Sequence, residues 1–258
     1  MSVPGLGTAV NVATVLAGSG LGLLLGHRLP QRTRDTVTDG LGLVTLMIGA
    51  LSAAAVGSAE LEGAVGGSAP VLIVLGSLLL GGIAGSLVDI EGRLEDLGEL
   101  IRARLSRGGG VAGGPAGSHD QARERFLEGF VTASLVFCVG PLTILGALSD
   151  GLGLGAEQLY LKATLDGFAA IAFAASLGVG VLASALTVAV VQGLLTLVGF
   201  AIGDFLPAAH LAALTATGGL LLLGVGLRLL RIRQVPVGNL LPALIVAPLL
   251  AALVAAFR

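Results

Sequence analysis

The chain has 258 residues, of which 55% are hydrophobic and only 12% are charged, and its formal net charge is −2. A soluble domain carries about 25% charged residues, and a soluble fold of this size could not keep so much apolar surface away from water. The near-neutral charge gives no reason to expect a nucleic-acid partner. The single cysteine, Cys138, excludes an intrachain disulfide and most cysteine-based metal sites. The composition predicts an all-α membrane protein.

Eight apolar segments are long enough to cross a bilayer as helices, which takes about 20 residues each. The boundary between the fifth and sixth depends on the short string LGVGVLASA, and without it the chain would have seven spans. In chain order the predicted spans are Thr8–Leu25, Val37–Gly57, Ala69–Val88, Phe126–Leu148, Leu161–Val179, Leu182–Gly203, Leu211–Leu227 and Val237–Ala256.

The positions of the basic residues test the number of spans. All but two of the fourteen lysines and arginines lie in three clusters, which follow spans one, three and seven. Cytoplasmic loops are enriched in such residues. With eight spans and the N-terminus outside, all three clusters face the cytoplasm, whereas seven spans would turn the last cluster outward. We therefore predict a multi-pass membrane protein with both termini outside.

Residues 91–125 form the one large aqueous segment. Ile90, Leu94, Leu97 and Ile101 recur at helical spacing, which predicts a cytoplasmic amphipathic helix. A glycine-rich loop follows it. We expect a solvated connector, with a regulatory site as the alternative.

The chain also contains an internal repeat. A shift of 177 residues places Leu29-Pro30 on Leu206-Pro207, Gly42 on Gly219 and Gly49 on Gly226. Span three likewise resembles span eight, and LEGF in span four resembles LDGF in span five. Each pair of spans crosses in opposite directions, so the repeats are predicted to be inverted, as in many secondary transporters. The alternative is a duplication kept only for folding. The predicted segments are 1–90 for the first repeat (spans one to three), 126–180 for a central helix pair (spans four and five) and 181–258 for the second repeat (spans six to eight).

Three strings resemble one known family: GTAVNVATVLAGSGLGLLLGHRLP, FLEGFVTASLVFCVGPLTILGALSDG and LYLKATLDGFAAIAFAASLGVGV. The family is the bacterial domain-of-unknown-function family 554, the YdfK/YqgA-type membrane proteins, and the resemblance covers nearly the whole chain. It implies an inner-membrane protein of transport-like character. It carries no established catalytic residues, so none is transferred.

Two acids are the first candidates for a site. Glu128 and Asp166 each stand in an acidic-Gly-Phe string near the start of an apolar helix. Ionisable residues inside a membrane span are costly and suggest function by default. The functional interpretation is a cation- or proton-coupling pair related by pseudo-symmetry. The structural alternative is an interfacial acid paired with Arg125 or Lys162.

Breaks in matching helices point to a transporter's binding site. Gly140-Pro141 interrupts span four, because proline removes a backbone donor, and Gly178 stands at the matching place in span five. Nearby hydroxyls and polar side chains in spans one and six could line a solute or ion pathway, with interhelical hydrogen bonds as the structural alternative. These candidates are Thr132, Ser134, Thr143, Ser176, Asn11 and Gln192.

Glycines at four-residue spacing are predicted to be structural. Gly18, Gly22 and Gly26 form a stripe of small residues that suits close contact with another helix.

Together these features predict a secondary transporter or permease for a small solute or ion. An ion or water channel is the second hypothesis, and a membrane scaffold or subunit is the third. No nucleophile motif or zinc-ligand spacing stands out, so we expect no enzyme activity, cofactor or metal centre. The expected partners are the lipid bilayer, the solute or ion, and further copies of the chain.

Overall fold

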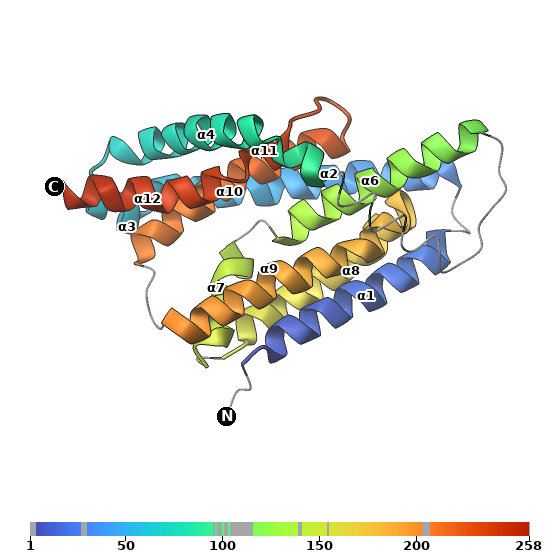
Figure 1. The fold of residues 1–258 in the computed structure, drawn as a ribbon, viewed down its shortest axis with the longest axis horizontal. Coiled ribbons are helices and arrows are strands. Elements are labelled where there is room, and N and C mark those ends of the chain that lie inside the picture. The colour runs from blue at the N-terminus through green and yellow to red at the C-terminus, as the bar shows by residue number, and fades with distance from the viewer. Residues whose placement is uncertain are drawn as a thin grey trace. The chain divides into compact units, whose positions relative to one another are not determined.

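The computed structural model (Figure 1) describes residues 4–26, 30–94, 96, 100, 103, 116–138, 141–153, 155–202 and 207–257, and no strand occurs among them. Within this part, seven helices are long and apolar enough to cross a membrane, and a bent helix pair makes an eighth candidate. The helices are α1 (Leu6–Gly26), α2 (Gln31–Ala53), η1 (Ala54–Gly57), α3 (Ala59–Val65), α4 (Ala69–Val88), α6 (Ala116–Cys138), α7 (Pro141–Gly151), α8 (Glu157–Leu177), α9 (Gly180–Ile202), α10 (Ala208–Leu229), α11 (Val237–Leu240) and α12 (Ala243–Ala256).

The spans agree with the prediction except around the fourth and fifth. The separation of spans five and six is confirmed, because α8 ends at Leu177 and α9 begins at Gly180. Gly178 makes this turn with φ of 87°, a conformation that favours glycine. The break predicted within span five is therefore wrong: α8 is continuous, and Gly178 lies beyond its end. In addition, α6 begins at Ala116 rather than Phe126, so its first turns lie in the predicted aqueous segment.

The helices gather into two compact units that do not follow the segments 1–90, 126–180 and 181–258, since each unit draws helices from several of them. Most of the predicted amphipathic helix and glycine-rich loop lies outside the described residues. Unit 1 is Met1–Leu41, Gly92–Cys138 and Leu142–Ala201, and unit 2 is Gly42–Glu91, Val139–Pro141 and Ile202–Arg258.

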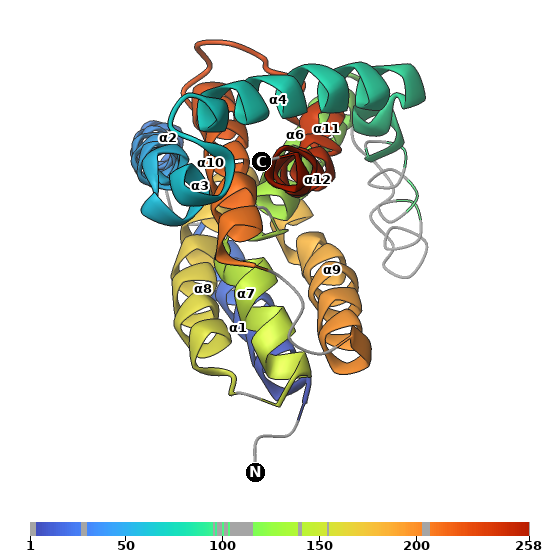
Figure 2. The ribbon, with the colours of Figure 1, turned by 90° about the vertical axis from the view of Figure 1, so that its left-hand side faces the viewer.

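In unit 1, α1 and α8 pack side by side over most of their length (Figure 1, Figure 2). The predicted glycine stripe forms this contact. A Cβ atom on Gly18 would collide with the carbonyl oxygen of Gly167, and one on Gly26 would lie 2.8 Å from the carbonyl oxygen of Ala175. Since the contact positions advance together along both helices, α1 and α8 run in the same direction. The stripe is thus structural, as predicted.

The bent pair α6 and α7 advances along α9. The α6 and α7 helices meet at an angle of 73°. The start of α9, at Gly180, packs against Phe126 in α6, and a Cβ atom on Gly199 near its end would lie 2.6 Å from the carbonyl oxygen of Leu148 in α7. A re-entrant loop would return toward the end from which it came, whereas this pair continues in one direction.

We infer that α6 and α7 form one broken span, which gives eight spans among the described residues. The parallel course of α1 and α8 agrees with this. Two parallel helices in a membrane must be separated by an odd number of crossings, because each crossing reverses the chain. Between α1 and α8, α2 and α4 supply only two crossings, so the α6–α7 pair supplies the third.

In unit 2, α2 and α10 cross where both carry glycine. A Cβ atom on Gly49 would lie 2.9 Å from the Gly219 carbonyl oxygen, and one on Gly226 would lie 3.1 Å from the Gly42 carbonyl oxygen. An early position of each helix thus meets a late position of the other, so the two helices run in opposite directions. Their backbones approach closely because no side chain intervenes.

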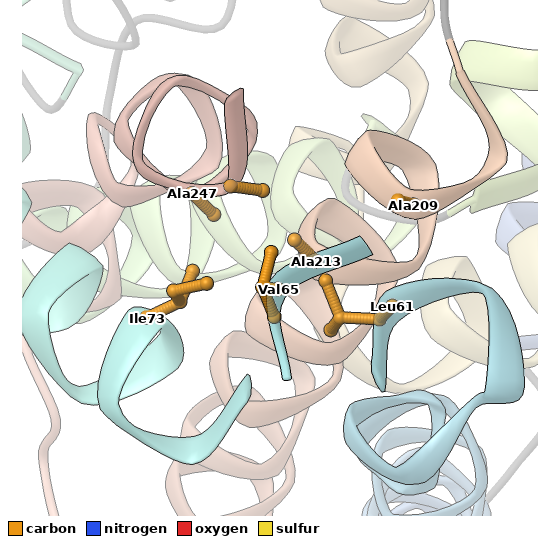
Figure 3. Packing of buried hydrophobic residues seen from close by; sticks show 7 residues of the cluster. Leu61, Val65, Ile73, Ala209, Ala213 and Ala247 are labelled. Carbon is orange, nitrogen blue, oxygen red and sulfur yellow. The ribbon is translucent and has the colours of Figure 1, made fainter. Parts of the chain in front are cut away.

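The core of unit 2 is built from small and branched apolar side chains (Figure 3). It joins α3, α4, α10 and α12, and its dense packing supplies the dispersion contacts that hold helices together in lipid. Its buried members are Leu61, Val65, Ile73, Ala209, Ala213, Ala247 and Ala251.

A polar network joins one end of unit 2. Arg228, in the last turn of α10, donates to Glu91 Oε1 at 2.5 Å. The second carboxylate oxygen of Glu91 accepts from the backbone N–H of Gly238 at 3.2 Å. The Glu91 N–H in turn donates to Asn239 Oδ1 at 2.9 Å. These bonds fix α10 and α11 to the chain that leaves α4.

We expect Gly22→Val to destabilise the protein, because the new side chain would collide with the Ile171 carbonyl oxygen and with Ala174. Overpacking of this kind costs about 1–3 kcal/mol. Gly20→Val is the matched control, since a Cβ atom at Gly20 meets nothing within 4 Å. Thermal unfolding in detergent should show a lower midpoint for Gly22→Val alone. Equal midpoints for the two variants would contradict the α1–α8 contact.

Cysteine labelling tests whether α6 and α7 cross the membrane. Ala122→Cys and Gln158→Cys, each in a Cys138→Ser background, place an exposed thiol at either end of the pair. A membrane-impermeant maleimide, applied to intact cells and to inverted vesicles, should label the two positions from opposite sides. Labelling of both from the same side would indicate a re-entrant loop and seven spans.

Candidate functional site

A buried ion pair lies between α1 and α8. Lys162 and Asp166 are 5% and 7% exposed, stand one turn apart on α8, and pair through Nζ and Oδ2. Asn11 of α1 donates from Nδ2 to the same carboxylate oxygen at 3.0 Å. Residues four apart share a helix face, so α8 presents both charges to one place. The pair is needed because a buried charge without a partner is strongly unfavourable.

The inner end of α6 reaches this ion pair. The thiol of Cys138, the last residue of α6, lies within electrostatic range of both Lys162 and Asp166. Across the helix break, the Thr143 hydroxyl donates to the Phe137 carbonyl oxygen at 3.1 Å. A helix end leaves carbonyl groups without intrahelical partners, and this bond satisfies one of them. The first helix of the broken span therefore ends within electrostatic range of the two charges.

Phe137 fixes the end of α6 against α8. Its ring meets the ring of Phe173 edge to face, with centroids 6.0 Å apart, and both side chains are fully buried. This contact and the Cys138 environment join the broken span to the helix that carries the ion pair.

Gln192 of α9 is fully buried, and neither its Nε2 nor its Oε1 has a hydrogen-bond partner.

The level of Gln192 along unit 1 follows from how α9 pairs with α1. The hydroxyls of Thr8 and Thr196 are 3.0 Å apart. Gln192 lies one turn before Thr196, and Asn11 lies about one turn after Thr8 on a helix of opposite direction. Gln192 and Asn11 therefore stand at the same level of the unit.

A second contact, between α6 and α9, places Gln192 at the same level of unit 1. Ser134 of α6 donates to the Thr187 hydroxyl of α9 at 3.1 Å. About one turn further along these parallel helices come Cys138 and Gln192. The two registers therefore place the unpartnered amide of Gln192 at the level of Asn11 and of the end of α6. The Oδ1 atom of Asn11 is also buried without a partner. We call Asn11, Lys162, Asp166 and Gln192 the polar cluster.

Glu128 is not part of the polar cluster. Its side chain is exposed on α6, whereas Asp166 is buried on α8. The two helices pack with opposite directions, as the contact of Gly129 with Leu177 and that of Phe137 with Phe173 indicate. Gly129, beside Glu128, meets Leu177, which lies about three turns beyond Asp166 on α8, so the structure does not bring the predicted pair together.

The other predicted residues fall into three groups. The side chains of Thr132, Ser134, Thr143 and Ser176 are buried. The Ser176 carbonyl oxygen accepts from Arg125 Nη2 at 2.5 Å, which ties α6 to the end of α8. Pro141 opens α7, consistent with a preference for proline at the first helical position. Gly140 lies outside the described residues.

Sequence reasoning missed the burial of Lys162 and Asp150. Lys162 was considered only as an interfacial partner, since it stands one residue into the predicted span. Asp150 lies beyond the predicted fourth span, which ends at Leu148, yet it is fully buried at the end of α7, and its Oδ2 accepts from the backbone N–H of Gly5 at 3.1 Å. A carboxylate is favourable beside the N-terminus of α1, where N–H groups lack partners. One usable signal was the i, i+4 spacing of Lys162 and Asp166.

A groove of about 730 Å³ lies between α1 and α9. Its walls are almost entirely apolar, with Val12, Leu16, Leu197 and Phe200 among them. Such a surface suits lipid chains and offers a polar solute little to bind. Among the described residues, no group of three histidines, cysteines or acids is arranged to hold a metal ion.

Lys162→Met should destabilise unit 1, because the Asp166 charge would be left in the interior without a cation. Breaking a buried pair in this way costs about 3–5 kcal/mol. The double variant Lys162→Gln/Asp166→Asn should regain most of the loss, since it keeps a hydrogen bond and carries no charge. The melting temperature can be followed with a thiol-reactive dye that reports exposure of Cys138. A wild-type melting temperature for Lys162→Met would contradict the burial of the pair.

The comparisons with known proteins agree with this architecture. The family model described as "Protein of unknown function (DUF554)" matches residues 6–252. The chain is 33% identical to "Uncharacterized protein YqgA" of Escherichia coli (strain K12), over 98% of this chain and 99% of the relative. It is 26% identical to "Uncharacterized membrane protein YdfK" of Bacillus subtilis (strain 168), over 97% of each. No solved structure matches. The chain is therefore a multi-pass membrane protein that belongs to the DUF554 family.

Proposed function

We propose that the protein is a secondary transporter or permease, rather than an enzyme, and that its polar cluster binds the solute or ion that it moves. The observation that carries the proposal is the ion pair of Lys162 and Asp166, buried among spanning helices beside a broken span. Ionisable groups inside a membrane are costly and mark substrate or ion pathways. Broken helices expose backbone groups at such sites.

The contrast between the two units supports this proposal. Among the described residues, the buried polar side chains of unit 2 are Thr45, Ser77 and Thr217, while all the others belong to unit 1. Unit 2 is held by glycine contacts and a small apolar core. Unit 1 holds buried amides and charges. We propose that unit 1 contains the binding site and that unit 2 serves as a frame.

The contacts between α2 and α10 support the inverted repeat. Under the 177-residue shift, Gly42 corresponds to Gly219 and Gly49 corresponds to Gly226. The contact of Gly49 with Gly219 and the contact of Gly226 with Gly42 are therefore images of each other. Two-fold related surfaces produce this exchange, in which residue i meets residue j and residue j meets residue i.

A second pair of contacts obeys the same exchange. Leu46 corresponds to Leu223 under the shift. Leu46 packs against Gly226, with Cδ2 2.7 Å from a Cβ atom built there, and the backbone of Leu223 lies 2.8 Å from one built on Gly49. The sequence repeat and the packing thus agree on one pseudo-two-fold axis perpendicular to two antiparallel helices. An axis of this kind relates helices that cross in opposite directions.

The closed state of the polar cluster favours an alternating-access transporter over an open channel. Lys162 and Asp166 are in contact, and Asn11 and Gln192 are fully buried. A channel would need a continuous polar-lined path. For the orientation, we propose that both termini face outward, because this places the three basic clusters in the cytoplasm.

Flux measurements test the proposed function. Wild-type protein in proteoliposomes should transport at least one member of a panel of small solutes and ions. Lys162→Gln/Asp166→Asn should fold but reduce that flux to the level of empty liposomes, because the charges that recognise the solute are gone. Glu128→Gln is the control, and it should keep wild-type flux because Glu128 is exposed and outside the cluster. Wild-type flux in the charge-free double variant would refute the proposed site.

A further inference from the structure

The polar cluster carries one positive and one negative charge, from Lys162 and Asp166, so its formal charge is zero. Three buried side-chain atoms at the level of the pair have no hydrogen-bond partner: Asn11 Oδ1, Gln192 Oε1 and Gln192 Nε2. Two of them accept hydrogen bonds and one donates. Unpartnered buried polar atoms are unfavourable and call for a ligand or bound water. The cluster therefore offers both charges, and both kinds of hydrogen bond, to a single ligand.

Charge balance restricts what that ligand can be. A lone cation attracted to Asp166 would leave the Lys162 ammonium without a counter-ion, and a lone anion attracted to Lys162 would leave the Asp166 carboxylate alone. Either state places an unpaired charge among spanning helices, which is strongly unfavourable. A ligand that itself carries both charges can face each member of the pair and keep the occupied cluster neutral.

The surroundings restrict the ligand to a small one. Three and four residues from Asp166 on α8 stand Lys162, Ala163, Ala169 and Ala170, and of the three alanines Ala163 and Ala170 are buried. The α1 backbone approaches α8 closely along the glycine stripe. A compact ligand fits such walls, while a bulky one would have to separate the two helices.

We propose that the polar cluster binds a small zwitterion of the α-amino-acid class. The ligand's carboxylate would pair with Lys162 and its ammonium group with Asp166. The amides of Asn11 and Gln192 would use their free atoms to accept from the ammonium group and donate to the carboxylate. When the ligand leaves, the lysine and the aspartate pair with each other, as observed here. This inference rests on the proposed function and names its substrate class.

Ligand-dependent melting tests the proposal directly. The single cysteine, Cys138, lies within electrostatic range of the ion pair, and a thiol-reactive dye reports its exposure during unfolding of the purified protein. The probes are glycine, L-alanine and L-serine as zwitterions, methylammonium as the cationic half, acetate as the anionic half and acetamide as a neutral amide. A ligand that binds only the folded state raises the melting temperature with its concentration.

We expect at least one of the three zwitterions to raise the melting temperature by several degrees at saturation, and the separate halves and acetamide to leave it unchanged. Lys162→Gln/Asp166→Asn should fold and lose the shift. Gln192→Leu should weaken it, because one donor and one acceptor are removed. Glu128→Gln should keep it in full.

Two results would overturn the inference. One is an increase in melting temperature with methylammonium or acetate as large as the largest increase with a zwitterion, which would indicate a site for a single charge. The other is no shift with any of the three zwitterions in folded wild-type protein. If another solute is nevertheless transported in proteoliposomes and its flux is lost in the charge-free double variant, the proposed function stands and only the substrate class is wrong.

Discussion

A charge inside a membrane must have a partner, and unit 1 is organised around that constraint. Lys162 and Asp166 satisfy it on one helix face, and Asn11 adds a hydrogen bond from a second helix. The pair is buried, α1 packs against the helix that carries it, and the end of α6 lies within electrostatic range. Burying two charges in the middle of spanning helices costs free energy, and apolar residues would fill the same space more favourably. Packing alone therefore does not explain the ion pair.

Glycine packing makes this geometry possible. The stripe on α1 brings two backbones together with no side chain between them, and the short Asn11 side chain can then reach Asp166. The same device joins α2 and α10 in unit 2, where its contacts exchange under the internal repeat. Small residues thus have two consequences here, since they hold helices together in lipid and they fix the register that aligns polar groups.

Sequence reasoning predicted what depends on composition and spacing. The spans, the turn between α8 and α9 and the stripe beginning at Gly18 follow from apolar run length and four-residue periodicity. Asp166 was identified because an acid in an apolar run is rare. The exposure of Glu128 was not predictable, because its motif is nearly the same as that of Asp166 and only tertiary packing separates them. The burial of Asp150 depends on the α1 N-terminus, which is remote in sequence.

The central claim is that the polar cluster is a binding site and not only a structural ion pair. The rate at which N-ethylmaleimide alkylates Cys138 in membranes tests it most directly, because this thiol lies within range of both charges. A solute that the protein transports should slow the alkylation of the wild-type protein as its concentration rises, and should have no effect in Lys162→Gln/Asp166→Asn. A transported solute that leaves the wild-type alkylation rate unchanged would contradict the account.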